Sequence, residues 1–398
     1  MYIEEKINTK IAGEYDVIVC GGGIAGISAA LSAARYGKKV ALLERQFMLG
    51  GLATSGIITI YLPLCDGMGK QVSFGIAEAL LRLSISEGAE ARYPENWLDG
   101  VGSRTEKDKR FEVRYNAQLF AILAEKLLLS EGVDILYGSY AVGVDMDGDK
   151  ICHIIVENKS GRQAYGVSSV VDATGDCDIA HFSGAPTARF KQGNVLAGWY
   201  YSVGENGYQL NMVGASDIPD EMKTAKNQSK PLIDRRFEGL DGKEVSEYTI
   251  LSHDVTYQNY RKKKEKDASL LPVTIATVPQ LRMTRKIVGE YELASDEMHK
   301  YFEDSIGMVS DWRRRGPVYE VPFRTLYSKA VKNLITAGRC TSVTDGMWDI
   351  MRVIPCCAVT GQAAGLAAAM SNDFATLDVS MLQQYLHDGG VVLHERDL

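Results

Sequence analysis

The amino-acid sequence predicts an α/β fold made of a parallel β-sheet, a β-meander and an inserted α+β domain. Three observations support this prediction. A short apolar segment at residues 15–20 runs into closely spaced glycines and then into small residues suited to a helix. Three strand-like segments separated by glycine-containing turns follow between residues 133 and 172. Irregular segments rich in aromatic and polar residues interrupt this pattern at 61–111 and 179–324.

The first element is a buried strand that ends in the pattern Gly21-x-Gly23-x-x-Gly26. In this pattern the first glycine permits a tight turn, the second lets the backbone approach a diphosphate, and the third lets the next helix pack on the strand. We expect that helix over residues 24–36, with its positive end directed at the phosphates. The pattern predicts a dinucleotide site. The alternative is a structural βαβ unit that holds no ligand.

A second strand at residues 39–43 leads to Glu44, at the spacing of the acid that accepts hydrogen bonds from an adenosine ribose. Such an acid occurs with both NAD and FAD, and the residues that follow separate the two. Gly50, Gly51 and Thr54 complete the pattern E-x(5)-G-G-x-x-T. This pattern resembles the glutathione-reductase-like class of flavoproteins. The resemblance implies a Rossmann-like FAD-binding domain.

Three more strands are expected at residues 133–145, 150–158 and 163–172, and they form the β-meander. The last of them runs into the sequence Ala-Thr-Gly-Asp at 173–176. In the flavoprotein class that this chain resembles, such a strand returns to the sheet after the meander. The resemblance therefore implies that the Ala-Thr-Gly turn lies beside the cofactor.

Two C-terminal segments make the resemblance more specific. Residues 333–339 read NLITAGR, and Arg352-Val353 precede the sequence TGQAAG. These segments resemble the FAD-dependent oxidoreductase family, akin to the flavin subunit of heterodisulfide reductases, and the resemblance covers most of the chain. Together with the glycine pattern it implies that FAD is bound by Gly21, Gly23, Ile24, Ala25, Gly26, Glu44, Arg45, Gly50, Gly51, Leu52, Ala53, Thr54, Ala141, Ala173, Thr174, Gly175, Asp176, Gly338, Arg339, Arg352, Gly361 and Gln362.

The cysteines depart from the pattern of many relatives, which carry cysteine sets for iron–sulfur clusters. The seven cysteines here are scattered and lack C-x-x-C spacing, so we expect reduced thiols without a cluster or another metal site. The chain carries 44 basic and 51 acidic residues, which argues against nucleic acid as a partner. A charged N-terminus and the lack of a long apolar stretch predict a cytoplasmic protein without a membrane partner.

The interruptions predict a discontinuous organisation. We expect the FAD-binding domain to comprise residues 1–60, 112–178 and 325–398, and a substrate or cap domain to comprise 61–111 and 179–324. The glycine pattern occurs once, so the sequence does not predict a second dinucleotide domain for a nicotinamide cofactor.

Several residues are candidates for catalysis. Arg282 and Arg285 lie one helical turn apart, so both would face one cleft and clamp a substrate carboxylate, or else lie on a helix surface. His181 follows the Ala-Thr-Gly-Asp sequence and is a candidate proton donor near the flavin, or a structural histidine. A helix expected at 356–371 would direct its positive end at the negative charge that hydride transfer leaves on the flavin.

Three functions are compatible with these patterns. The first is an FAD-dependent oxidoreductase that transfers two electrons, as hydride, to or from a small organic substrate. The second is a flavoprotein subunit that relays electrons to a partner protein. The third is a non-redox FAD-binding protein. The sequence does not identify the substrate, the direction of the reaction or the oligomeric state.

Overall fold

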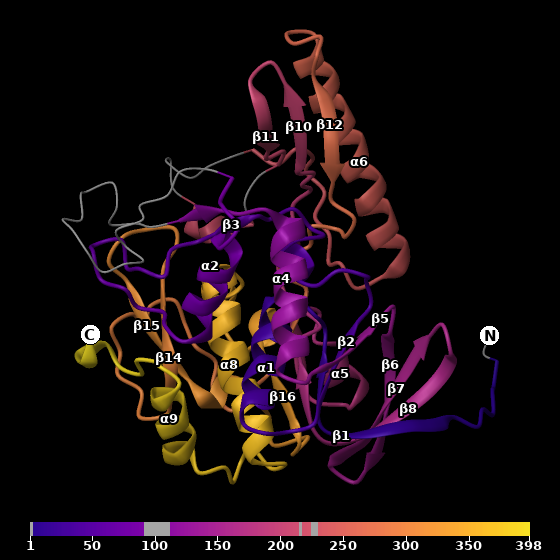
Figure 1. Cartoon of the computed structure of the whole chain (residues 1–398), viewed down its shortest axis with the longest axis vertical. Helices are drawn as coiled ribbons and strands as arrows, with labels where there is room; N and C mark the ends of the chain where they lie inside the picture. The colour runs from indigo at the N-terminus through magenta and orange to yellow at the C-terminus, as the bar shows by residue number, and fades with distance from the viewer. Residues whose placement is uncertain (1–2, 91–111, 215–216, 224–229) are drawn as a thin grey trace.

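A computed structural model describes residues 3–90, 112–214, 217–223 and 230–398 (Figure 1). Its main sheet has the strand order β5-β2-β1-β8-β7-β6, and β16 pairs with β8. The strands that pair in parallel are β1 (Lys10–Cys20), β2 (Val40–Glu44), β5 (Asp134–Tyr137), β8 (Gly161–Asp172) and β16 (Leu334–Thr336). The antiparallel strands β6 (Tyr140–Asp147) and β7 (Lys150–Asn158) join β8 in the meander that the sequence predicts.

Both faces of β1 are buried at its carboxyl end, residues 17–20, as expected for a parallel strand covered on two sides. Val17 and Val19 belong to a large apolar core, whereas Ile18 and Cys20 belong to a second core beneath the meander. The helices that contribute to the large core include α1 (Ile24–Arg35), α2 (Ile76–Ile85), α4 (Ala117–Ser130) and α8 (Ile354–Met370). The short helix α5 (Asp178–Phe182) packs on the second core.

The helices α1 and α8 cross at unusually short range because α8 places glycines at the contact. A Cβ added at Gly361 would lie 2.3 Å from the carbonyl oxygen of Ala25, and one added at Gly365 would lie 2.0 Å from that of Ala29. Every residue of α8 except Met370 is buried. The predicted helices at 24–36 and 356–371 are therefore confirmed, and α8 begins two residues earlier than expected.

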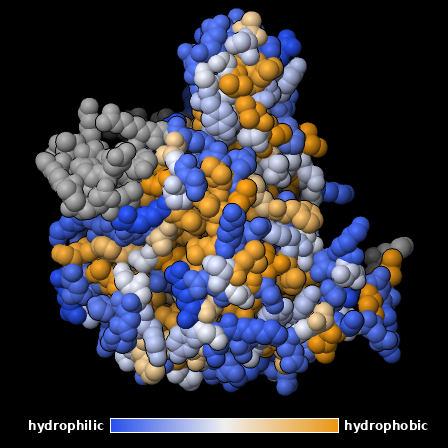
Figure 2. All heavy atoms as spheres, viewed as in Figure 1, coloured by the Kyte–Doolittle hydropathy of each residue, from blue (hydrophilic) through white to orange (hydrophobic). Residues whose placement is uncertain are grey.

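Part of the long second insertion forms an arm that projects from the body (Figure 1). A three-stranded sheet with the order β11-β10-β12 lies beside the 23-residue helix α6 (Gly242–Lys264). Its strands are β10 (Tyr200–Gly204), β11 (Gly207–Asn211) and β12 (Leu271–Ile275). Figure 2 shows orange, apolar patches on this arm. The apolar side chains that remain exposed on its strands include Val203, Leu271, Val273 and Ile275.

Smaller elements complete the structure. Within the described ranges, three two-stranded sheets pair β3 (Ile60–Tyr61) with β4 (Val113–Arg114), β9 (Thr187–Arg189) with β13 (Arg285–Ile287), and β14 (Ser305–Ser310) with β15 (Val318–Pro322). Two further helices are α7 (Asp345–Met351) and α9 (Val379–Asp388). Among the described residues no single helix has both the length and the apolar character to cross a membrane, although α7 and α8 pass that test as a bent pair. The domain boundaries given above remain a prediction.

Candidate functional site

A cavity of about 690 Å³ opens where the carboxyl ends of β1, β2, β8 and β16 meet. Its volume falls within the range of about 300–1,000 Å³ that small-molecule and cofactor sites occupy. This edge of a parallel sheet is also where ligands bind in open α/β folds. The residues predicted to bind cofactor that line the cavity are Gly21, Gly23, Ile24, Ala25, Glu44, Arg45, Gly50, Gly51, Leu52, Ala53, Ala141, Ala173, Thr174, Gly175, Asp176, Gly338, Arg339 and Arg352.

The turn between β1 and α1 leaves room for a ligand beside its backbone. Gly21 has a φ of +104°, and a Cβ there would lie 2.4 Å from the carbonyl oxygen of Ala173. A Cβ at Gly23, in contrast, would meet nothing within 4 Å. The helix α1 starts at Ile24 without a side-chain cap, so the first N–H groups of the helix are available to a ligand at the cavity. This turn fits a diphosphate.

Glu44 holds a fixed position at the end of β2. Its carboxylate accepts hydrogen bonds of 2.7 Å from the main-chain N–H groups of Gly22 and Gln46. Burial raises the pKa of this carboxyl group, and the two hydrogen bonds oppose that shift. The side chain is 6% exposed and lines the cavity. It therefore presents a buried acceptor next to the glycine turn, as an adenosine ribose requires.

A second glycine turn packs directly on the first. The N–H of Gly50 donates to the carbonyl of Gly22 over 2.8 Å, and Gly50 has a φ of +101°. A Cβ at Gly51 would lie 3.3 Å from the Cα of Gly23. Thr54 supports this turn from behind, because its hydroxyl donates to the carbonyl of Leu49 over 2.5 Å. Thr54 itself does not line the cavity.

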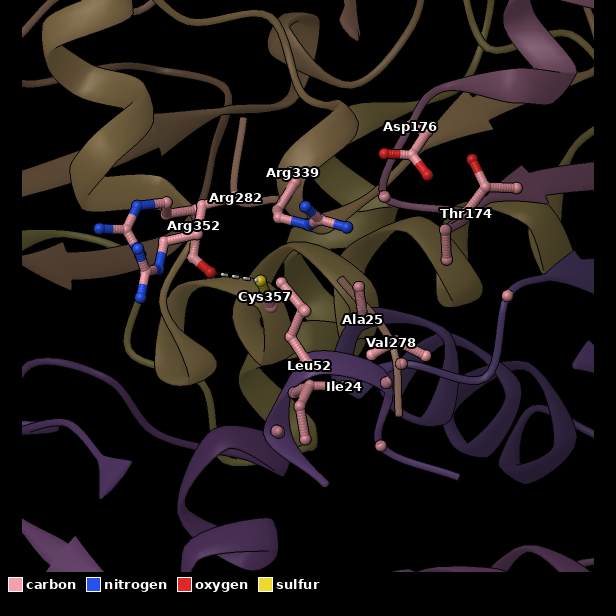
Figure 3. Close-up of a pocket in the computed structure, with 18 of the residues that line it drawn as sticks. Ile24, Ala25, Leu52, Thr174, Asp176, Val278, Arg282, Arg339, Arg352 and Cys357 are labelled. Atoms are coloured by element: carbon pink, nitrogen blue, oxygen red, sulfur yellow. Dashed lines mark hydrogen bonds between the residues drawn. The ribbon is translucent and has the colours of Figure 1, made fainter. Parts of the chain in front are cut away.

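The Ala-Thr-Gly turn is anchored by the fully buried Asp172. This carboxylate accepts hydrogen bonds from the N–H and the hydroxyl of Thr174 and from the N–H of Ala180. Gly175 has a φ of +81°, and a Cβ there would lie 2.2 Å from the guanidinium of Arg339. Arg339 therefore lies against the turn, with one nitrogen donating to the carbonyl of Leu281 over 2.6 Å. Figure 3 shows Thr174, Asp176 and Arg339 on the same side of the cavity.

The N-terminus of α8 reaches the cavity at another point of its wall. Val353, Ile354 and Cys357 line the cavity, and α8 begins with proline in its first turn and without a side-chain cap. The Cys357 thiol donates to the carbonyl of Arg352 over 3.3 Å (Figure 3). Burial raises the pKa of this thiol to about 12, so it stays protonated at neutral pH. The uncapped helix end favours negative charge here.

Four residues predicted to bind cofactor do not line the cavity: Gly26, Thr54, Gly361 and Gln362. A Cβ at Gly26 would lie 1.8 Å from the carbonyl oxygen of Gly21, so Gly26 serves the close packing of α1 on the turn. Gly361 serves the crossing of α1 and α8. The Gln362 amide oxygen accepts from the N–H of Ile76 over 2.8 Å, at the start of α2.

The helical turn expected to carry Arg282 and Arg285 is wrong, because residues 281–293 form no helix and contain β13. The buried Asn194 side chain binds the backbone here: its oxygen accepts from the N–H groups of Arg282 and Met283, and its amide donates to the carbonyl of Met283. These bonds use the main-chain groups that a helix needs. Arg282 and Arg285 consequently do not share one face of a helix.

Of the three catalytic candidates, Arg282 lines the cavity. Arg285 lies off the cavity and pairs with Asp178 over 2.7 Å. His181 also lies outside the cavity lining, with an exposed side chain on α5. The pKa of His181 is lowered, mainly by partial burial and further by the positive charges of Arg285 and Arg189 nearby. The structure thus brings one of the three to the cavity.

The sequence did not single out several residues that line the cavity from the arm and the loops. They are apolar or aromatic: Trp199, Met212, Val278, Pro279, Leu281 and Trp312. Trp199 lies in the insertion 179–324, whose composition alone predicts a substrate or cap domain. Nothing local in the sequence separates these residues from ordinary core residues. Among the described residues, no group of three or more His, Cys, Asp or Glu side chains is arranged to hold a metal ion.

Comparison with known proteins identifies the class. The family model described as FAD dependent oxidoreductase matches residues 16–269 and 257–386. The chain therefore belongs to this family, its sheet is that of a Rossmann-like FAD-binding fold, and its cofactor is FAD. The glycine turns, Glu44 and the two helix N-termini described above fit this cofactor.

Curated relatives match over shorter segments. The chain is 30% identical over 138 residues to the tRNA uridine 5-carboxymethylaminomethyl modification enzyme MnmG 1 of Fusobacterium nucleatum, which covers 32% of this chain and 22% of that protein. It is 33% identical over 72 residues to the thioredoxin reductase of Ureaplasma parvum, which covers 18% of this chain and 23% of that protein. The chain thus spans less than a quarter of the length of these relatives.

A solved structure is similar over a longer stretch. The geranylgeranyl bacteriochlorophyll reductase-like protein of Thermoplasma acidophilum shares 15% identity, with 94% of this chain and 83% of that chain covered and a TM-score of 0.46.

Proposed function

We propose that this chain is an oxidoreductase that transfers two electrons, as hydride, between FAD and a small organic substrate bound in the same cavity. The observation that carries the proposal is the composition of the cavity wall. Beyond the glycine turns, the cavity continues along apolar residues of the insertion, including Trp199, Val278 and Leu281. FAD supplies the electron-pair chemistry when it is bound. The chain contributes a partly apolar chamber next to it.

The residues of this chamber suit hydride transfer in two ways. Apolar walls exclude water, which strengthens electrostatic interactions inside the site and protects reactive groups. The uncapped first turn of α8 lies at the same wall and stabilises negative charge that develops there. Both features favour hydride transfer without requiring a catalytic acid or base among the side chains.

Anaerobic stopped-flow measurements of flavin absorbance test the proposal. The purified holoprotein is mixed with a panel of reduced and oxidised small metabolites, and bleaching or reoxidation of the flavin is followed. We expect at least one small molecule to exchange two electrons with the flavin. If dithionite reduces the flavin but no small molecule does, the chamber is not a substrate site, and the alternative predictions of a relay subunit or a structural flavin gain support.

A pair of variants locates the substrate. Val278→Phe narrows the cavity, whereas Val273→Phe makes the same change on an exposed strand of the arm, where Val273 is 51% exposed. We expect Val278→Phe to slow reduction by the substrate while reduction by dithionite is unchanged, and Val273→Phe to slow neither. Equal substrate rates in both variants would place the substrate elsewhere.

A further inference from the structure

Two arginines on the cavity wall share one arrangement, although they come from different parts of the chain. Arg282 pairs with Asp217 over 3.0 Å, and its guanidinium lies 5.5 Å from the ring centroid of Trp199. This set of three residues belongs to the long second insertion. Asp217 is fully buried, and the Arg282 side chain is 5% exposed.

The second set repeats the first. Arg352 donates to Asp349 through two nitrogens, over 2.9 and 2.5 Å, and its guanidinium lies 5.8 Å from the ring centroid of Trp312. Asp349 is fully buried, and the Arg352 side chain is 10% exposed. The Trp312 indole N–H donates to the main-chain carbonyl of Asp349 over 2.8 Å, which ties the set together.

In both sets the arginine and the tryptophan line the cavity, whereas the aspartate stands behind them. Figure 3 shows the side chains of Arg282 and Arg352 on the same side of the cavity, where they overlap in this view. The described residues supply no acceptor for Nε and Nη2 of Arg282 or for Nη1 of Arg352. Donors therefore remain available on both groups.

If its role were only structural, this arrangement would add little to the stability of the fold. Burying an ion pair requires desolvation of both groups, and apolar residues of the same volume are often as stable. Planar guanidinium groups bind carboxylates through paired N–H donors. The two indole rings provide flat apolar surface for the rest of such a molecule.

We propose that Arg282 and Arg352 together bind the carboxylate of a small organic acid, with its body against Trp199 and Trp312. This assignment rests on the proposed function and names the substrate class for the same cavity. It also replaces the sequence-based pairing of Arg282 with Arg285 by a pairing with Arg352. The buried aspartates act as positioning residues, because each pairs with one of the two cavity arginines; Asp349 also pairs with Arg313 over 3.6 Å.

Benzoate and benzamide provide a matched pair of probes, since both have a flat apolar body and only benzoate carries a charge. Binding to oxidised holoprotein is measured from the change in the flavin absorption spectrum, and does not depend on turnover. We expect benzoate to bind and benzamide to bind much more weakly. Arg352→Gln and Arg282→Gln are each expected to weaken benzoate binding about 10- to 100-fold.

Three controls accompany these variants. Arg324→Gln removes an arginine that pairs with Asp304 outside the cavity lining, and should leave benzoate binding unchanged. Arg352→Lys retains the positive charge without the planar fork, and should bind benzoate with intermediate strength. Flavin content and FAD affinity are measured for every variant, so that a variant that fails to fold is recognised and Arg352→Lys then carries the test.

Equal binding of benzoate and benzamide, or unchanged benzoate binding in Arg352→Gln, would overturn the assignment. Loss of FAD affinity in Arg352→Gln at unchanged benzoate affinity would also overturn it, and would assign this arginine to the cofactor. These results differ from failure of the proposed function. If carboxylates do not bind but the flavin exchanges electrons with a neutral metabolite, only the substrate class is wrong.

Discussion

The crossing of α1 and α8 should be intolerant of a single methyl group. A Cβ at Gly365 would lie 2.0 Å from the carbonyl oxygen of Ala29, so the helices must separate by more than about 1 Å to reach ordinary contact. Alanine in place of glycine favours a helix by about 1 kcal/mol. Overpacking a rigid contact costs about 1–3 kcal/mol and can exceed this. Subtracting the helix gain from this cost leaves a net destabilisation of up to about 2 kcal/mol for Gly365→Ala, and more if the two helices cannot separate.

The control for this variant is Gly242→Ala at the first residue of α6, where an added Cβ meets nothing within 4 Å. The assay is urea unfolding followed by circular dichroism, with FAD at one fixed concentration because bound ligand raises the midpoint. Gly365→Ala should unfold at lower urea than wild type, and Gly242→Ala at equal or higher urea. FAD affinity should also fall in Gly365→Ala, since both helices place their N-termini at the cavity. A Gly365→Ala midpoint equal to that of Gly242→Ala would refute the packing argument.

Three other predictions follow from the site. Glu44→Ala removes the buried acceptor beside Gly22 and should weaken FAD binding about 10- to 100-fold in a fluorescence titration; unchanged affinity would show that Glu44 does not contact the cofactor. Burial and the nearby Asp176 raise the pKa of Asp178 from 3.8 to about 6. The folded chain thus holds this proton more tightly than the unfolded chain, and the corresponding stability, present at low pH, is lost as the pH rises through about 6. Asp178→Asn should flatten the dependence of the unfolding midpoint on pH in this window, and a slope equal to that of wild type would contradict the assignment. Six of the seven cysteines are buried, so alkylation of the native protein at mild pH should modify mainly Cys152, as peptide mass spectrometry can show; rapid modification of the others would contradict their burial.

The fold and the cofactor side of the cavity were predictable because their signals are local. A glycine that needs a positive φ, such as Gly21 or Gly50, marks a turn whatever the rest of the chain does. The apolar strands and the helix after each turn fix how these glycines approach one another. The turn at 173–176 joins them because its strand, β8, pairs with β1 in parallel.

The substrate side was not predictable in the same way. Arg282 meets Asp217 and Trp199 only because the insertion folds over the cavity, and these residues are far apart in the sequence. The extended course of residues 281–285 depends on a buried asparagine 88 residues away from Arg282, which no periodicity could reveal. The TGQAAG motif predicts that Gly361 contacts the cofactor. In the structure, Gly361 lies on the face of α8 that packs against α1.

The central claim is that the first glycine turn, the N-terminus of α1 and Glu44 hold the nucleotide half of FAD. Apoprotein titrated with FAD and with FMN tests it most directly, because FMN carries the same isoalloxazine ring but lacks the adenosine phosphate half. We expect FAD to bind at least about 100-fold more tightly than FMN, because a few charge-assisted hydrogen bonds provide an affinity difference of this size. Equal affinity for the two flavins, or no binding of FAD, would contradict it.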